Sequence, residues 1–140
     1  MKKTGLAILL ASFITVGCAS NQDKASTVPD MHTTEIALDW PGTYEGTFPC
    51  ADCEGIKMSL KLLQDKTYIL KEEYLTNRPG DKIATTTGQF QFEKTNPSLI
   101  RLDTTPDNRV FFVGEGYLEA RDRETGKPFE TKLNYKLIKK

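Results

Sequence analysis

The stretch FPCADCEG, residues 48–55, holds the two side chains best suited to chemistry, the thiols of Cys50 and Cys53. A Cys-x-x-Cys pair can form a disulfide, carry out thiol–disulfide exchange, or supply two thiolates to a soft metal ion such as Cu(I). The compartment decides between these uses, because thiols oxidise in secreted and periplasmic proteins and stay reduced in the cytosol.

The N-terminus predicts export and lipidation. Lys2 and Lys3 precede an apolar run, residues 5–16, that is shorter than the roughly 20 residues needed to cross a bilayer. The run leads into Thr15-Val16-Gly17-Cys18, which resembles a bacterial lipobox with threonine in place of the usual leucine. We therefore expect residues 1–17 to be a lipoprotein signal peptide and Cys18 to be acylated, with palmitate among its chains.

The residues after Cys18 predict the location of the protein. Ala19 stands where aspartate often retains lipoproteins in the inner membrane of Gram-negative bacteria, so we expect lipid anchoring at the periplasmic face of the outer membrane. Residues 18–38 are polar and aperiodic, which is typical of a flexible tether. The formal net charge is zero, with 19 basic and 19 acidic residues, and does not favour a nucleic-acid partner.

Residues 39–140 have the pattern of a small all-β domain. Ile56, Met58, Leu60 and Leu62 alternate with polar residues, which predicts a strand with one wet face. Further strands are expected at 67–74, 83–87, 89–92, 99–102, 110–113, 117–121 and 131–138, joined by short turns. This pattern predicts a small antiparallel up-and-down β-barrel, lipocalin-like in general shape, with Trp40 plugging one end.

Residues 42–56, GTYEGTFPCADCEGI, together with the strands that follow, resemble the N-terminal domain of the NlpE family. The resemblance implies a non-enzymatic outer-membrane lipoprotein associated with copper resistance. It also implies signalling of surface adhesion or lipoprotein-trafficking faults to an inner-membrane envelope-stress sensor kinase, with the lipoprotein-trafficking machinery as a further partner. Longer members carry a second, OB-like domain with its own Cys-x-x-Cys pair. This sequence stops at Lys140 after one barrel, so sensing through that second pair is not implied.

In an oxidising compartment, a Cys50–Cys53 disulfide is the favoured use of the pair, and it would stabilise the fold by about 2 kcal/mol. Catalytic exchange is disfavoured because Asp52 and Glu54 should raise the thiol pKa values. Cu(I) binding by the reduced pair stays open, with Met58 as a third ligand, although its alternation with Ile56 and Leu60 favours a core position.

Other functional signals are weak. The single histidine, His32, lies in the expected tether, and no nucleophile motif or phosphate-binding glycine loop is present. The charge runs Glu72-Glu73 and Arg121-Asp-Arg-Glu124 are expected on solvated faces. Bulky interior residues, including Phe90 and Phe92, predict a filled barrel that does not require a ligand cavity. The alternative to a signalling lipoprotein is a barrel that binds copper or a small ligand.

Overall fold

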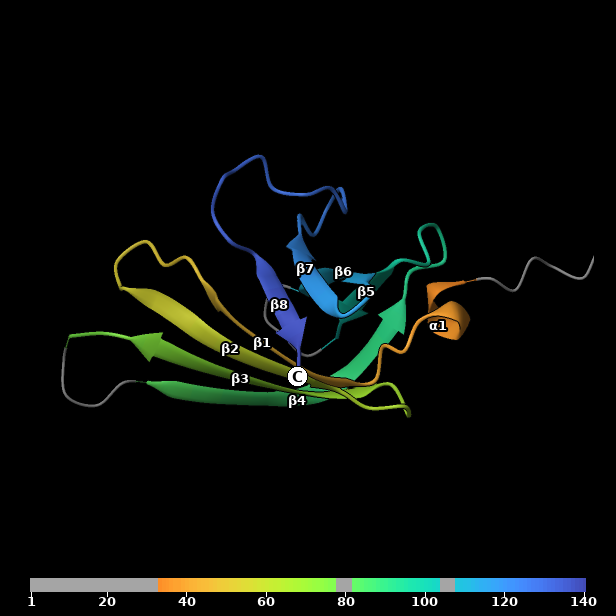
Figure 1. Cartoon of the computed structure of the whole chain (residues 1–140), viewed down its shortest axis with the longest axis horizontal. Coiled ribbons are helices and arrows are strands. Elements are labelled where there is room, and N and C mark those ends of the chain that lie inside the picture. Colours follow the sequence, from red (N-terminus) through yellow and green to blue (C-terminus); the bar gives the residue numbers. More distant parts are fainter. Residues whose placement is uncertain (1–32, 78–81, 104–107) are drawn as a thin grey trace, which may run out of the picture.

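Eight antiparallel strands close into a barrel in the computed structural model, which describes residues 33–77, 82–103 and 108–140 (Figure 1). Each strand pairs with the next, and β1 pairs with β8. A four-residue helix, α1 (Thr34–Ala37), precedes the strands β1 (Gly42–Phe48), β2 (Gly55–Leu62), β3 (Thr67–Leu75), β4 (Ile83–Phe92), β5 (Leu99–Leu102), β6 (Val110–Gly114), β7 (Tyr117–Arg121) and β8 (Lys136–Lys139). The expected all-β barrel is confirmed.

Two strand expectations are wrong. The break expected at Gly88 does not occur, because the β3–β4 ladder continues through this residue, which lies opposite Tyr68. The last strand covers only Lys136–Lys139 and not residues 131–138. Before it, the Ala120 N–H still donates to the carbonyl of Tyr135 at 2.9 Å, and the Asn134 side chain donates to the carbonyl of Thr47 at 3.3 Å and accepts from the N–H of Lys136 at 3.1 Å.

The core consists of the side chains that alternate inward along every strand. Its largest fully buried members are Tyr44, Tyr68, Phe90, Phe111, Met58, Leu60, Leu62, Leu70, Ile100, Leu102, Leu118 and Leu137. Burial of this apolar surface is the main force that stabilises the barrel. Ile56 and Phe92, which were expected in the filled interior, pack only partly buried against this cluster.

One end of the barrel, which we call the base, is closed by Trp40. The indole is 6% exposed and packs edge-on against Phe90 and Phe92, with ring centroids 5.5 and 5.6 Å away. Its Nε1 donates to the carbonyl of Glu35 in α1 at 3.0 Å, and Tyr44 Oη donates to the Trp40 carbonyl at 2.6 Å. Burial, and then the charge of Asp39, raises the pKa of Tyr44 to about 12. The plug role expected for Trp40 is confirmed.

The helix α1 lies within the range expected to be tether, and it packs on the base. Thr34 and Ser98 share a hydrogen bond of 3.0 Å, and Glu35 pairs with Lys66 at 2.6 Å. Within the described residues, no helix is long and apolar enough to cross a membrane.

Closure of the sheet depends on a close approach between β1 and β8, which pair at Tyr44–Lys139 and Glu45–Ile138. A Cβ atom at Gly46 would lie 2.5 Å from the backbone carbonyl oxygen of Lys136. Only glycine therefore lets the two strands come this close without a backbone shift.

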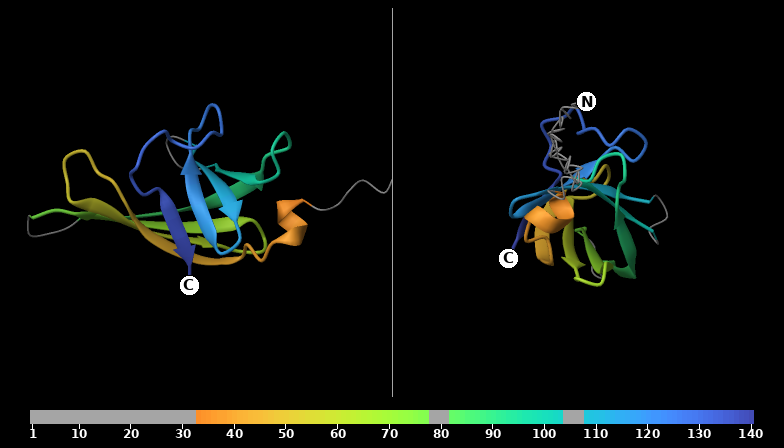
Figure 2. Two further views of the ribbon diagram at one scale, coloured as in Figure 1. Left: turned by 45° about the horizontal axis from the view of Figure 1, so that its top comes forward. Right: turned by 90° about the vertical axis from the view of Figure 1, so that its right-hand side faces the viewer.

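The strands are unequal in length, and this leaves the opposite end open. In Figures 1 and 2, β2, β3 and β4 form a long curved sheet, while β5 to β8 are shorter and lie across part of it. We call this end the mouth. It contains the end of β1, the start of β2, the start of β6 and the end of β7, and it lies away from α1 (Figure 1).

Candidate functional site at the barrel mouth

The two cysteines lie in the connection between β1 and β2, at the mouth. They form a disulfide with an S–S distance of 2.02 Å and a Cα–Cα distance of 5.3 Å. The N–H of Glu54 donates to the carbonyl of Leu75 at 3.0 Å, which ties the end of this loop to β3. Of the three uses that the spacing allows, the structure has the disulfide.

The residues considered for Cu(I) are not brought together. Met58 is 1% exposed and lies inside the barrel on β2, whereas Cys50 and Cys53 lie in the loop before that strand begins. Their sulfur atoms are bonded to each other, so neither is a thiolate. Among the described residues, no group of three His, Cys, Asp or Glu side chains is placed to hold a metal ion. Cys18 and His32 fall outside the described residues.

A partly buried ion pair crosses the mouth. Glu72 is 7% exposed, and Arg109 Nη1 donates to its Oε1 at 2.8 Å. The expectation that Glu72 lies on a solvated face is therefore wrong. The even-numbered residues of β3, including Tyr68 and Leu70, face the interior, and Glu72 continues that series. The same alternation in the sequence could have identified it.

A cavity of about 360 Å³ lies beside this ion pair. Its apolar wall includes Phe48, Ile56, Met58, Val110, Ala120 and Tyr135. The inward-facing residue near the end of β7 is the small Ala120, and the chain does not pair continuously again until β8 begins at Lys136. Small side chains and a long connection thus leave space where a filled barrel was expected.

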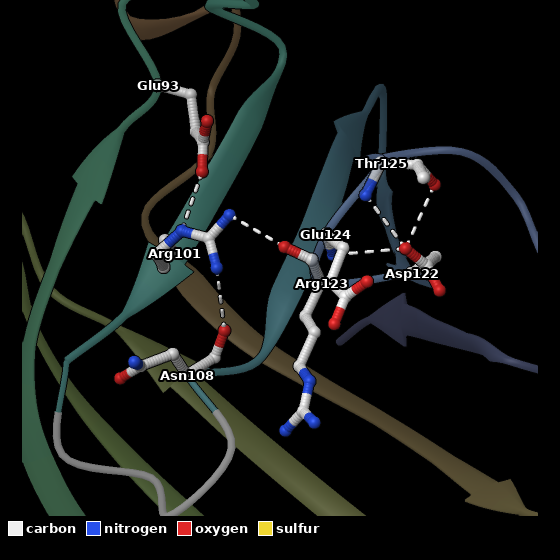
Figure 3. A network of polar contacts seen from close by, with 7 residues as sticks. All are labelled: Glu93, Arg101, Asn108, Asp122, Arg123, Glu124 and Thr125. Carbon is white, nitrogen blue, oxygen red and sulfur yellow. Dashed lines mark hydrogen bonds and ion pairs between the residues drawn. The ribbon is translucent and has the colours of Figure 1, made fainter.

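The charge run from Arg121 to Glu124 lies at the edge of the mouth, which we call the rim. It forms specific contacts there and is not simply solvated. Arg121 stacks on the Phe112 ring at 4.7 Å and pairs with Glu119 at 3.2 Å. Asp122 Oδ1 accepts from the Thr125 N–H at 2.8 Å, the Thr125 hydroxyl at 2.9 Å and the Glu124 N–H at 3.0 Å (Figure 3). These bonds lower the pKa of Asp122, and the bond from the Thr125 backbone N–H has the largest effect.

Arg101 on β5 holds the rim in place (Figure 3). Its guanidinium donates to Glu93 at 2.7 Å, to the carbonyl of Asn108 at 3.2 Å and to the carbonyl of Arg123 at 2.9 Å. The side chain of Arg123 points away from Arg101 in Figure 3 and also lines the cavity. Arg101 therefore positions the backbone that carries Arg123 at the mouth.

Known proteins are similar to this chain in sequence and in architecture. The family model of the NlpE N-terminal domain matches residues 44–132. The lipoprotein NlpE of Escherichia coli strain K12 is 31% identical over 134 residues, which are 96% of this chain and 54% of that protein. The chain thus spans about half the length of this curated relative.

Two crystal structures have similar folds. A Shewanella oneidensis protein, provisionally described as a lipoprotein, has a TM-score of 0.68 and 38% identity, with 78% of this chain and 96% of that one covered. NlpE of E. coli, described as the Cpx pathway activator, has a TM-score of 0.54 and 33% identity, with 68% and 48% covered. The Shewanella match covers nearly the whole of that chain, so that protein crystallised as a barrel of this kind alone. The present chain belongs to the NlpE family.

Proposed function

We propose that this protein is a non-enzymatic lipoprotein of the envelope stress response, anchored through acylated Cys18 at the periplasmic face of the outer membrane. The observation that carries the proposal is the family match across the barrel, together with the lipobox-like residues 15–18. The E. coli relative is a lipoprotein and a Cpx pathway activator. By extension, the partner of this chain is an inner-membrane sensor kinase, and the triggers are surface contact, copper or faults in lipoprotein trafficking.

The arrangement of the barrel supports this role. The segment that follows the anchor enters the fold at the base, where α1 and Trp40 pack, while the disulfide loop and the cavity lie at the other end. Residues 18–32 have a maximum reach on the order of 50 Å. Attachment at the base leaves the mouth at the end of the barrel opposite the tether.

The test of the anchor is Cys18→Ser. The wild-type chain should incorporate labelled palmitate and fractionate with the outer membrane, and the variant should do neither, because it lacks the acylated thiol. Ser20→Ala is the matched control and should behave as wild type. Equal membrane association of the wild-type and Cys18→Ser chains, without label in either, would contradict the proposal.

Copper binding through Cys50, Cys53 and Met58 is the alternative proposal, and it gains no geometric support. A Cu(I) site at the pair requires reduction of the disulfide, because thiolates are the ligands that Cu(I) prefers. Titration of Cu(I) into the reduced barrel and into its Cys50→Ser, Cys53→Ser double variant tests it. A copper site would bind one ion in the reduced protein and none in the variant.

A further inference from the structure

The cavity at the mouth is built from two kinds of surface. Its depth is apolar, with Met58 at 1% exposed and the rings of Phe48 and Tyr135 packed edge-on, 5.5 Å apart. Phe129, 41% exposed, packs on the Tyr135 ring at 4.7 Å and extends this wall to the rim. An apolar molecule or tail would therefore enter between aromatic side chains that are already in place.

The charged groups around the cavity are mostly basic. Three arginines, Arg109, Arg121 and Arg123, line it, against two carboxylates, Glu72 and Asp122, and Arg121 also pairs with Glu119 at 3.2 Å. The charge of Glu72 is countered by Arg109, and one oxygen of Asp122 accepts three hydrogen bonds from the chain that follows it. In the described part of the chain, the Arg123 guanidinium makes no hydrogen bond or ion pair; its charge acts on the neighbouring Asp122, whose pKa it helps to lower, and its N–H groups stay free to donate at the rim.

We propose that the mouth binds a single-chain amphiphile with an anionic head, such as a medium-chain alkyl carboxylate. The tail would lie against Met58, Ala120 and Phe48, and the head would accept hydrogen bonds from Arg123 at the rim. A volume of about 360 Å³ is near the lower limit of small-molecule sites, which favours one alkyl chain over a two-chain phospholipid. This inference does not depend on lipidation or signalling, and it goes beyond the proposed function.

Binding is measured by two-dimensional ¹H–¹⁵N NMR on the barrel domain, residues 33–140. The three probes share a ten-carbon tail and differ in the head group: decanoate, decanol and decyltrimethylammonium, each below its micelle threshold. Decanoate should shift the amide signals of Val110 and Ala120 and the Nε–H signal of Arg123, while signals at the base, such as Ala37, stay unchanged. It should bind about tenfold more tightly than decanol, and the cation should bind most weakly.

Two variants locate the site. Arg123→Gln should weaken decanoate binding about three- to tenfold, because the head loses its cation, and should leave decanol binding unchanged. Lys57→Gln, which removes the same charge from the exposed outer face of β2, is its control. Ala120→Phe should abolish binding of both probes by filling the cavity, whereas Ala37→Phe at the base should have no effect.

Equal affinity for the three head groups, tighter binding of the cation, or no saturable shift with decanoate would each overturn the proposal. Shifts confined to residues outside the mouth would do the same. If Ala120→Phe does not fold, Arg123→Gln decides alone, because Arg123 is an exposed rim residue whose loss does not threaten the core.

Discussion

The ion pair between Glu72 and Arg109 should contribute measurably to stability, because it lies across the mouth and not on a free surface. The side chains are 9% and 28% exposed, and the donor and acceptor are 2.8 Å apart. Two unit charges about 4 Å apart attract by about 4 kcal/mol at an effective dielectric constant near 20. Part of this attraction is offset by the cost of removing both groups from water. We expect a coupling free energy of about 1–3 kcal/mol.

A double-mutant cycle isolates this term. Arg109→Gln should destabilise the barrel by about 2–3 kcal/mol, because it leaves the buried carboxylate of Glu72 without its countercharge. Glu72→Gln should cost less, about 1 kcal/mol, because the amide oxygen still accepts from Arg109. The double variant should be more stable than the sum of the single changes predicts.

The free energy of unfolding is measured in urea from the fluorescence of Trp40, the single tryptophan, which is buried at the base. The control cycle uses Glu45 and Lys140, a pair at 3.4 Å whose side chains are 40% and 63% exposed. That pair should couple by less than about 1 kcal/mol and lose its coupling in high salt. If the Glu72–Arg109 coupling is no larger than the control, the account of the mouth as a partly buried polar site is refuted.

Three further predictions concern the strand closure, the disulfide and the base. Gly46→Ala should destabilise the barrel by about 1–3 kcal/mol in the same urea assay, because its Cβ would lie 2.5 Å from a β8 carbonyl oxygen. Gly116→Ala is the control. The space around its Cβ is open, so it should reduce the free energy of unfolding by less, through its left-handed backbone alone. Protein made in the periplasm should show no alkylatable Cys50 or Cys53 thiol by intact mass, and replacing both by serine should cost about 2 kcal/mol; two free thiols would contradict the disulfide. Stability should fall as pH rises from 10 towards 12, because Tyr44 ionises in the unfolded chain before it does in the fold, and Tyr44→Phe should flatten that fall; an equal slope in both proteins would count against a buried, raised pKa.

The periodicity of the sequence was sufficient to predict the barrel, but it did not locate where pairing stops. Alternation of Leu133, Tyr135 and Leu137 suggested a strand from residue 131, yet Leu133 is 59% exposed and pairing begins only at Lys136. Alternation records which residues could face a core, and it carries no information on whether a partner strand lies alongside.

The sequence was sufficient to predict the disulfide of the candidate site but not its cavity. The disulfide was the favoured of three uses that the cysteine spacing allowed, and the preference rested on the expected export of the chain. The cavity depends on the distance across the mouth and on the small side chain of Ala120, which come from tertiary structure. Glu72 is intermediate, because its period-two position pointed inward while its charge suggested solvent. Its partner Arg109 is 37 residues away in sequence, and no sequence pattern predicted that the two side chains would meet.

The most direct test of the central claim is the stress-pathway output of a chain held at the inner membrane by Ala19→Asp. If the protein is a lipoprotein whose barrel activates an inner-membrane sensor, this variant should raise reporter output several-fold over wild type at matched expression. Adding Cys18→Ser to the same chain should remove the effect, because the barrel would then lack its anchor. Output that is unchanged by Ala19→Asp, with the protein shown to reside at the inner membrane, would contradict the account.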